Sequence, residues 1–282
     1  MKLPLLILGV IAVAALAMPL VAAALHSDPS SVDLLSRYAD PSLAHPLGTD
    51  ELGRDMLLRL LEGGRVSLAI GIAAALTAAA IGTTIGLAAG YLGGWTDRIL
   101  MRLADGVIAL PLLPLLIVLA ALDLQKLGVP QWLVDSPAMS LLRIIALAVL
   151  IGWTTAARLV RGATLVTRQR DFVRAARSLG AGVPHILWRH ILPNVMAPLV
   201  VATTLSVGDI ILLESVLSFL GLGVQPPLAS WGSMLSNAQS LITSSPMLAI
   251  YPGAMIFVTV IACNLLGDAL LARFDPRDAA RV

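Results

Sequence analysis

Residues 171–193, DFVRAARSLGAGVPHILWRHILP, form a polar and arginine-rich island between two long apolar segments. At helical spacing the first part of this stretch separates an apolar face from a charged face. The apolar face carries Phe172, Ala175, Ala176 and Leu179, and the charged face carries Asp171, Arg174 and Arg177. Gly180 and Gly182 permit a turn, and Pro184 suits the first turn of a second helix. We therefore predict a helix–turn–helix hairpin whose small residues let a groove on another protein approach the backbone closely.

The chain as a whole is too apolar for a soluble globular protein. Of its 282 residues, 58% are hydrophobic and 13% are charged. Six apolar segments approach or exceed the ~20 residues that a helix needs to cross ~30 Å of hydrocarbon: 3–25, 66–92, 104–122, 141–160, 195–220 and 248–271. We predict an all-α, polytopic membrane protein with six transmembrane helices.

The basic residues are distributed unevenly between the two sides of these helices. Six spans place both termini on one side, where thirteen Lys and Arg residues fall, against six on the other side. Because cytoplasmic loops carry the excess of Lys and Arg, we predict that both termini and the 171–193 hairpin are cytoplasmic.

Residues 1–65 are predicted to form an N-terminal unit, separate from a five-helix core over residues 66–282. Ala22, Ala23 and Ala24 would suit a signal-peptide cleavage site, but the long apolar run before them favours an uncleaved transmembrane anchor. An acidic external segment follows. Its residues 54–62 place apolar side chains (Met56, Leu57, Leu60 and Leu61) against charged ones (Arg54, Asp55, Arg59 and Glu62), which predicts an amphipathic helix lying at the membrane surface.

Glycine and proline predict the packing and shape of the next two helices. Gly82, Gly86 and Gly90 recur every four residues, and such a stripe lets helix backbones approach closely within lipid. Pro111 and Pro114 interrupt the third apolar segment, where we predict a bend.

The fifth apolar segment contains two acids, Asp209 and Glu214. On insertion scales a central acid costs about 2.5 to 3.5 kcal/mol, whereas each Leu, Ile, Val or Phe returns about 0.3 to 0.6 kcal/mol. The fourteen such residues in this segment therefore only offset the two acids. Thr203, Ser206 and Asp209 share one stripe, and Glu214 and Ser218 share another, about 140° away. We consider Asp209, Glu214 and Ser218 candidates for a translocation path, with intramolecular partners for both acids as the alternative.

The stretch ESVLSFLGLGVQPPLASWGSML, residues 214–235, contains four helix breakers: Gly221, Gly223, Pro226 and Pro227. We predict that the fifth helix ends here. An ordered external loop is expected to follow, with Trp231 as an anchor at the membrane interface.

The hairpin also resembles the cytoplasmic coupling loop, or EAA loop, of permease subunits in binding-protein-dependent ABC importers. Ala175, Ala176 and Gly180, followed by Leu192 and Pro193, carry the resemblance. Arg174 stands where the family has Glu, so an ion pair formed by that Glu does not carry over. The resemblance implies a type I ABC importer permease fold with a coupling loop over residues 164–193. Its implied contacts with the ATPase are Arg174, Ala175, Ala176, Arg177, Gly180, Ala181, Leu192 and Pro193.

Three further motifs are similar to the permease subfamily that serves dipeptides, oligopeptides and, in some members, nickel. They are LGTDELGRD at 47–55 with RVSL at 65–68, ES-LSFLGLG-QPP-SWG-ML within 214–235, and YPGAMIFVTVIACNLLGDALLARFDPR at 251–277. The resemblance implies a non-catalytic subunit that moves di- or oligopeptides across the inner membrane. Its implied partners are a related permease in a heterodimer, one or two ATP-binding subunits and an extracytoplasmic solute-binding protein.

The chain contains no GxxxxGK[ST] phosphate loop, which predicts that ATP and Mg²⁺ bind to separate subunits. The single Cys263 cannot form an intrachain disulfide, and no Cys/His cluster has metal-ligand spacing. We therefore expect no catalytic residue, metal or cofactor in this chain, lipid around its helices, and no nucleic-acid partner.

Two other functions are compatible with single features of the sequence. A proton- or ion-coupled secondary transporter would use Asp209, Glu214 and Asp268 as relay groups. It does not explain the arginine-rich hairpin, and the two halves of the chain show no obvious repeat. An intramembrane hydrolase would need a base at membrane depth. The four histidines lie outside the predicted spans: His26, His45, His185 and His190.

Overall fold

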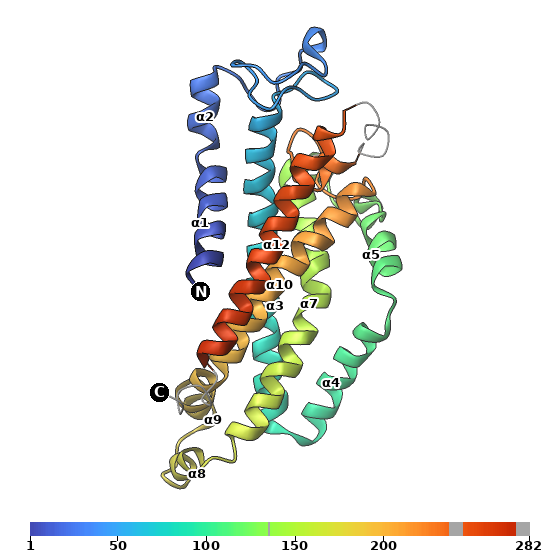
Figure 1. Ribbon diagram of the computed structural model, residues 1–282. Coiled ribbons are helices and arrows are strands. Elements are labelled where there is room, and N and C mark those ends of the chain that lie inside the picture. The colour runs from blue at the N-terminus through green and yellow to red at the C-terminus, as the bar shows by residue number, and fades with distance from the viewer. Residues whose placement is uncertain (135, 237–244, 275–282) are drawn as a thin grey trace.

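The computed structural model describes residues 1–134, 136–236 and 245–274. These residues form an elongated helical bundle in which the one β-type pairing is an isolated bridge between Thr49 and Asp55 (Figure 1). The predicted all-α fold is confirmed. The helices are α1 (Lys2–Leu16), α2 (Met18–Leu25), α3 (Met56–Leu92), α4 (Gly94–Ala109), α5 (Leu112–Ala120), α6 (Gln131–Val134), α7 (Pro137–Thr167), α8 (Asp171–Ser178), α9 (Val183–Ile186), α10 (Leu192–Phe219) and α12 (Met247–Phe274).

Four helices in the described part of the chain are long and apolar enough to cross a membrane. They are α3, α7, α12 and the continuous helix that α9 forms with α10 through a π-helical turn, Leu187–Ile191. Two bent pairs give two more spans if each pair counts as one: α1 with α2, bent by 49°, and α4 with α5, bent by 86°. These six units correspond to the six apolar segments of the sequence.

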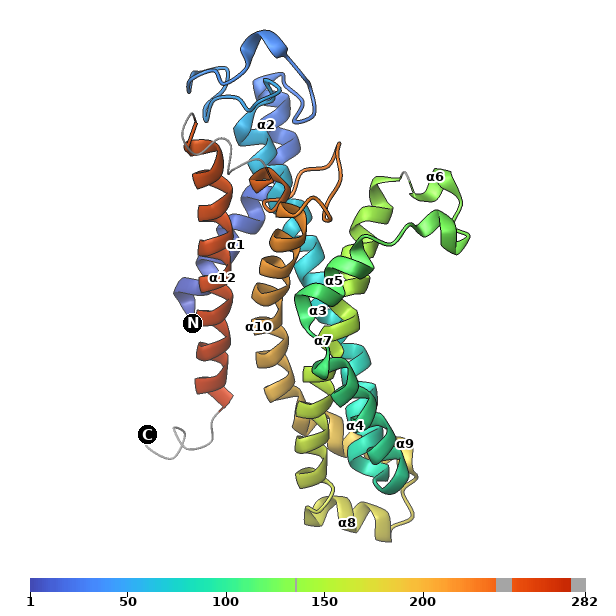
Figure 2. The same cartoon turned by 90° about the vertical axis from the view of Figure 1, so that its right-hand side faces the viewer.

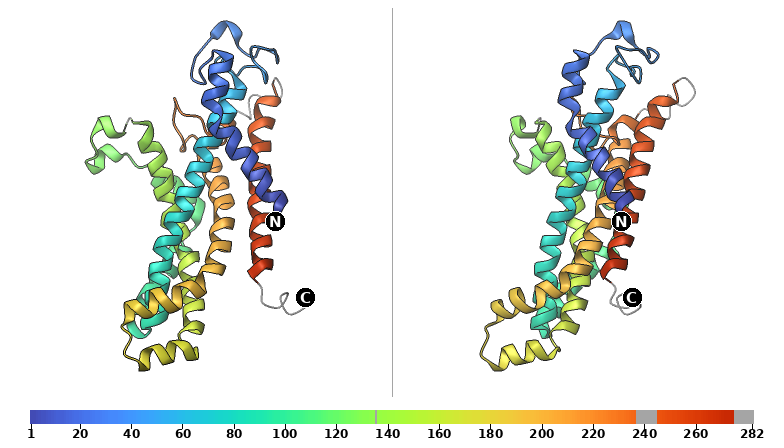
Figure 3. Two further views of the ribbon diagram at one scale, coloured as in Figure 1. Left: turned by 90° about the vertical axis from the view of Figure 1, so that its left-hand side faces the viewer. Right: turned by 60° about the vertical axis from the view of Figure 1, so that its left-hand side comes forward.

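The two ends of the bundle differ in structure. The loop over residues 26–55 covers one end, and α8 and α9 form the other end (Figures 1 and 2). Helices α1 and α2 lie on one side of the bundle, and α4 and α5 lie on the other. The long helix α12 runs beside α10 and ends toward the α8 end of the molecule (Figure 3). The hairpin and the 26–55 loop therefore occupy opposite ends.

The glycine stripe of α3 packs against α7, as the sequence predicts. A Cβ added at Gly82 would lie 2.5 Å from Cβ of Ala156, and one at Gly86 would lie 2.6 Å from the carbonyl oxygen of Ala157. A Cβ at Gly90 would lie 2.7 Å from the Cβ atom of a threonine on α7. Side chains at these positions would push the two helices apart, so the glycines set the distance between them.

The predicted bend in the third span occurs at Pro111. Leu110 has an extended ψ of 140°, which is the conformation that the residue before a proline favours. Pro114 lies in the first turn of α5 and does not interrupt it. The bend therefore has one cause, the break at Pro111.

The predicted amphipathic surface helix is wrong, because residues 56–62 are the first turns of α3. This helix begins at Met56, where the Asp55 side chain accepts a hydrogen bond from the Leu58 N–H at 2.9 Å. It continues without a break past residue 65, so the predicted domain boundary falls inside it. The charged side of these turns lies under the preceding loop, where buried Arg59 pairs with Asp50 at 3.3 Å.

The predicted interfacial position of Trp231 is also wrong. Its side chain is fully buried, and its Nε1–H donates a hydrogen bond of 3.0 Å to the carbonyl oxygen of Leu60. Gly63 and Gly64 of α3 leave the space for its ring, because a Cβ added at either would lie 3.0 Å from a ring atom. The loop after α10 is therefore anchored in the protein interior by this residue.

Candidate functional site

The predicted hairpin is present at the end of the bundle opposite the 26–55 loop. Gly180 has a φ of +83° between α8 and α9, and Pro184 lies in the first turn of α9. Glycine adopts this left-handed conformation without steric cost, so Gly180 reverses the chain direction. Because α9 continues through the π-helical turn into α10, the second arm of the hairpin and a transmembrane span form one continuous helix.

Three buried side chains hold the hairpin against the bundle. Val173 of α8, Ile186 of α9 and Ile191 of the π-helical turn each expose 1% of their surface or less. They form one apolar cluster with Val160 of α7 and Val195 of α10. Burying an aliphatic side chain of this size stabilises a fold by about 1.5–3 kcal/mol. The hairpin is therefore packed as part of the bundle.

The apolar face predicted for α8 is not the face that packs on the bundle. Phe172, Ala175 and Leu179 are exposed, and Leu179 exposes 88% of its surface. The buried residue is instead Val173, which lies outside the predicted face. These apolar side chains are therefore open to contact from outside this chain.

The eight predicted coupling residues all lie in the hairpin or in the first turn of α10, but their exposure differs. Those that are exposed are Arg174, Ala175, Arg177, Gly180 and Pro193. Three are partly buried: Ala176, Ala181 and Leu192. The last two pack against the apolar cluster that holds the hairpin.

Two arginines connect the hairpin region to the end of α3. Arg168 Nη1 donates hydrogen bonds to the carbonyl oxygens of Gly90, at 2.8 Å, and Tyr91, at 3.2 Å. Carbonyls in the last turn of a helix lack intrahelical donors, so Arg168 caps α3. Arg177 Nη2 donates to the Tyr91 hydroxyl at 3.2 Å, and its guanidinium lies 5.5 Å from the centroid of the same ring. Arg177 is thus engaged within this chain.

Ion pairs join α4 to α7 between the hairpin and the bend. Arg161 binds both carboxylate oxygens of Asp97, with Nη2 2.6 Å from Oδ2. Arg158 Nη2 lies 2.5 Å from Oδ1 of Asp105. Bidentate pairs such as that of Arg161 fix geometry as well as charge, so α4 is held on α7 at a defined position.

Glu214 is fully buried in α10 and accepts hydrogen bonds from three serine hydroxyls. Ser218 and Ser230 each donate to Oε1 at 2.6 Å, and Ser67 of α3 donates to Oε2 at 3.2 Å. The Ser67 oxygen in turn accepts a hydrogen bond from the Trp231 N–H at 3.2 Å. Glu214 therefore has intramolecular partners, which was the alternative to a place on the translocation path, and it joins α3, α10 and the loop after α10.

The other two acids of the predicted relay lie apart from Glu214. Asp209 and Asp268 are exposed, and Asp209 has no hydrogen-bond or ion-pair partner among the described residues. Thr203 and Ser206, on the stripe of Asp209, donate to carbonyl oxygens four residues earlier in their own helix. Nor do any three His, Cys, Asp or Glu side chains in the described ranges lie close enough together to hold a metal ion.

Ser67 and Ser230 were not predicted as partners of Glu214. Both residues lie in quoted motifs, Ser67 in RVSL and Ser230 in the segment before Trp231. An acid at membrane depth needs hydrogen-bond donors, so serines elsewhere in the spans and loops were the available signal. Which serines reach the acid depends on how distant segments pack.

The bundle with two bent spans and a hairpin continuous with α10 has the fold of an ABC transporter permease. A crystal structure of an amino acid ABC transporter with histidines matches this fold over 78% of this chain and 94% of that chain, with a TM-score of 0.51 and 16% identity. Residues 82–278 match the family described as the binding-protein-dependent transport system inner membrane component, and the chain belongs to this family. It is a permease subunit of an ABC importer.

Two relatives are similar over most of their length. The chain is 44% identical over 237 residues to a glutathione transport system permease protein of Pectobacterium atrosepticum, covering 84% of this chain and 74% of the relative. It is 40% identical over 251 residues to a protein described as a peptide permease of Brucella suis, covering 88% and 78%. The predicted family is thereby confirmed, and the ion-coupled transporter and the intramembrane hydrolase have no support.

Proposed function

We propose that this chain couples ATP hydrolysis by partner subunits to the import of peptides, and that the 171–193 hairpin is the coupling contact. The supporting observation is the continuity of α9 with α10. A displacement of the hairpin by a partner acts on a transmembrane helix directly, without a flexible joint. Movement of α10 then changes which side of the membrane the translocation cavity faces.

The exposed surface of the hairpin has the chemistry that such a contact requires. Ala175 and Gly180 carry little side chain, so a groove can reach the backbone there. Phe172 and Leu179 add apolar area beside them, and Arg174 supplies a charge at the rim. The contact residues in this proposal are Arg174, Ala175, Ala176, Arg177, Gly180, Ala181, Leu192 and Pro193.

The proposed complex contains other subunits, because this chain supplies the membrane helices and the coupling contact while ATP is hydrolysed elsewhere. A second, related permease completes the membrane part as a heterodimer, and one or two ATP-binding subunits hold ATP and Mg²⁺ on the cytoplasmic side. A solute-binding protein delivers cargo from the other side. The excess of Lys and Arg supports an orientation in which the hairpin and both termini are cytoplasmic.

Peptide cargo is proposed because of the relatives, one described as a glutathione permease and one as a peptide permease. Asp209 is the candidate for a group on the translocation path, because it is an exposed acid on the span that the hairpin would move. Glu214 and Ser218 would act at the boundary of that path by holding the loop after α10 on α3.

Reconstitution into proteoliposomes tests this function. The chain is assembled with its partner permease, ATPase subunits and solute-binding protein, and uptake of a labelled tripeptide is measured. We expect uptake to require ATP and to persist when an uncoupler removes the ion gradients. Uptake that stops with the uncoupler while ATP is maintained contradicts the proposal, as does the absence of peptide uptake.

A further inference from the structure

A cavity of about 250 Å³ lies between the segment before α3 and the loop after α10. It is at the end of the bundle opposite the hairpin. Its charged lining residues are Asp50, Glu51, Arg54 and Arg59, and we call it the Arg59 cavity. Pockets that enclose a drug-sized ligand measure about 300–1,000 Å³. The Arg59 cavity therefore suits one end of a ligand rather than a whole molecule of that size.

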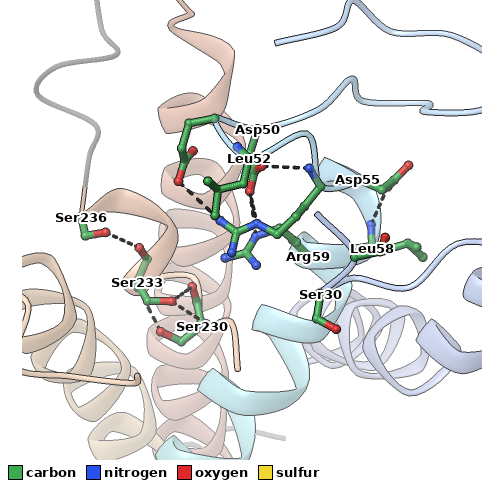
Figure 4. A network of polar contacts seen from close by, with 12 residues as sticks. Ser30, Asp50, Leu52, Asp55, Leu58, Arg59, Ser230, Ser233 and Ser236 are labelled. Carbon is green, nitrogen blue, oxygen red and sulfur yellow. Dashed lines mark hydrogen bonds and ion pairs between the residues drawn. The ribbon is translucent and has the colours of Figure 1, made fainter. Parts of the chain in front are cut away.

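Arg59 is a buried cation with unused hydrogen-bonding capacity. Its side chain exposes 9% of its surface, and its Nε atom lies 3.3 Å from Oδ2 of Asp50. Its Nη1 atom is buried without a hydrogen-bond partner. Figure 4 shows Arg59 beside Asp50, near the turn that carries Ser230 and Ser233. A buried N–H of a charged group without a partner is costly, and an absent ion or ligand is one explanation for it.

The other polar side chains that line the cavity are already engaged. Arg54 is paired with both carboxylates of the cavity, at 2.7 and 3.4 Å. Ser233 and Ser236 donate their hydroxyl protons to backbone carbonyls, at 3.1 and 2.7 Å. The Gln225 amide donates to two carbonyls of its own loop, at 3.1 and 3.2 Å. Among the described lining residues, Arg59 is therefore the one with a buried donor atom that has no partner, and we take it as the group available to a ligand.

The charge of the lining restricts the ligand. The charges of the two acids and the two arginines sum to zero. Asp50 and Glu51 would therefore repel a dianion, and the lining has no excess positive charge to offset that repulsion. A single carboxylate matches the planar fork of a guanidinium, which can donate two parallel hydrogen bonds to it. The carboxylates of Asp50 and Glu51 would accept from an N–H group next to that carboxylate. A carboxylate with a neighbouring amide or amine is the end of a peptide.

We propose that Arg59 binds the free C-terminal carboxylate of a small peptide in the Arg59 cavity. The peptide part of this inference rests on the proposed function, and the carboxylate part rests on the cavity alone. Arg59 thereby has a role in recognition of the cargo by the membrane subunit itself, at the end of the bundle opposite the hairpin.

Equilibrium binding to the transporter complex in lipid nanodiscs tests the inference. The solute-binding protein is omitted, so that only the membrane complex selects the ligand. The probes are Ala-Ala-Ala and its C-terminal amide. We expect the wild-type complex to bind the acid about tenfold more tightly than the amide, because a charge-assisted hydrogen bond is lost with the amide. Arg59→Lys and Arg59→Gln should reduce this ratio to about one to three, because neither offers the fork.

The matched control is Arg65→Gln, which removes an exposed arginine of α3 that does not line the cavity. It should keep the wild-type ratio. Equal affinity of the wild type for acid and amide overturns the inference, as does an unchanged ratio in an Arg59→Lys complex that elutes like the wild type. If Arg59→Gln does not assemble, Arg59→Lys decides. If neither assembles, the wild-type preference for N-acetylalanine over N-acetylalanine amide decides, and a lack of preference overturns the inference.

Peptide uptake by the wild-type transporter is measured separately. If the transporter takes up the peptide but does not bind the C-terminal acid more tightly than the amide, only the proposed carboxylate site is ruled out. If the transporter takes up no peptide but still prefers N-acetylalanine to its amide, and this preference depends on Arg59, only the proposal that the cargo is a peptide is ruled out. The two failures are therefore distinguishable.

Discussion

The hydroxyl of Ser67 in α3 donates a hydrogen bond of 3.2 Å to the carboxylate of Glu214 in α10, 147 residues later in the chain. The Ser230 hydroxyl reaches the same carboxylate at 2.6 Å from the loop that follows α10. One acid thus joins three segments. An acid at membrane depth is costly unless its oxygens accept hydrogen bonds, and here each oxygen has at least one donor.

Replacing this acid should destabilise the protein. Glu214→Ala leaves three buried hydroxyls without their acceptor, and we expect it to lower the free energy of unfolding by about 2–4 kcal/mol. Glu214→Gln keeps one acceptor oxygen and should lower it less. Thermal unfolding in detergent measures both. The control is Asp209→Asn, an exposed acid of the same helix, which should change stability by less than about 0.5 kcal/mol. Equal effects of Glu214→Ala and Asp209→Asn would contradict this role.

The contact between α3 and α7 should not accept a larger residue at Gly86. Its added Cβ would lie 2.6 Å from a backbone oxygen, which cannot move without shifting α7. We expect Gly86→Ala to cost about 1–3 kcal/mol of stability, measured as a lower midpoint of thermal unfolding. Gly106→Ala in α4 is the control, because nothing lies within 4 Å of its added Cβ. If Gly86→Ala unfolds at the same temperature as Gly106→Ala, the close approach is not required.

The hairpin should loosen when Arg177 is removed. Arg177→Ala deletes the hydrogen bond and the cation–π contact to Tyr91, which together are worth about 0.5–1 kcal/mol at an exposed site. We expect backbone amides of α8 to exchange hydrogen about two- to fivefold faster. Arg174→Ala removes only an exposed pair with Asp171 at 3.9 Å and should leave exchange unchanged. Equal exchange in both variants would mean that Arg177 does not hold the hairpin.

Transport should depend on the size of the side chain at position 175. Ala175 is exposed in this chain, so Ala175→Trp should change its stability by less than about 0.5 kcal/mol. In the complete transporter the large ring should prevent the groove of the ATPase from reaching the backbone. We expect ATP-driven uptake to fall at least about tenfold, which corresponds to about 1.4 kcal/mol of lost coupling. The small Ala175→Ser should keep uptake, and equal uptake in the two variants would exclude the contact. Gly180 is a less suitable probe because its φ of +83° strains any other residue.

Much of the fold was predictable because it depends on local features of the chain. Apolar segments of sufficient length form helices in a membrane, since no other open-ended structure satisfies the backbone there. The glycine spacing at Gly82, Gly86 and Gly90 predicts a close helix contact, and Pro111 predicts the bend. The hairpin was predictable as two helices and a turn. Its packed side was not, because Phe172 and Val173 are both apolar and only the position of α7 decides which one is buried.

The polar contacts at the end of the bundle opposite the hairpin were not predictable from local features of the chain. The sequence alone determined that the chain is a helical membrane protein with a basic hairpin, because hydropathy, length and charge distribution are properties of single segments. Only the tertiary structure decided that Trp231 lies in the interior, that Arg59 borders a cavity, and that Ser67 and Ser230 meet Glu214. Each of these depends on which distant segments pack side by side, and a polar side chain in a protein interior is stable only where such a neighbour supplies its hydrogen bond.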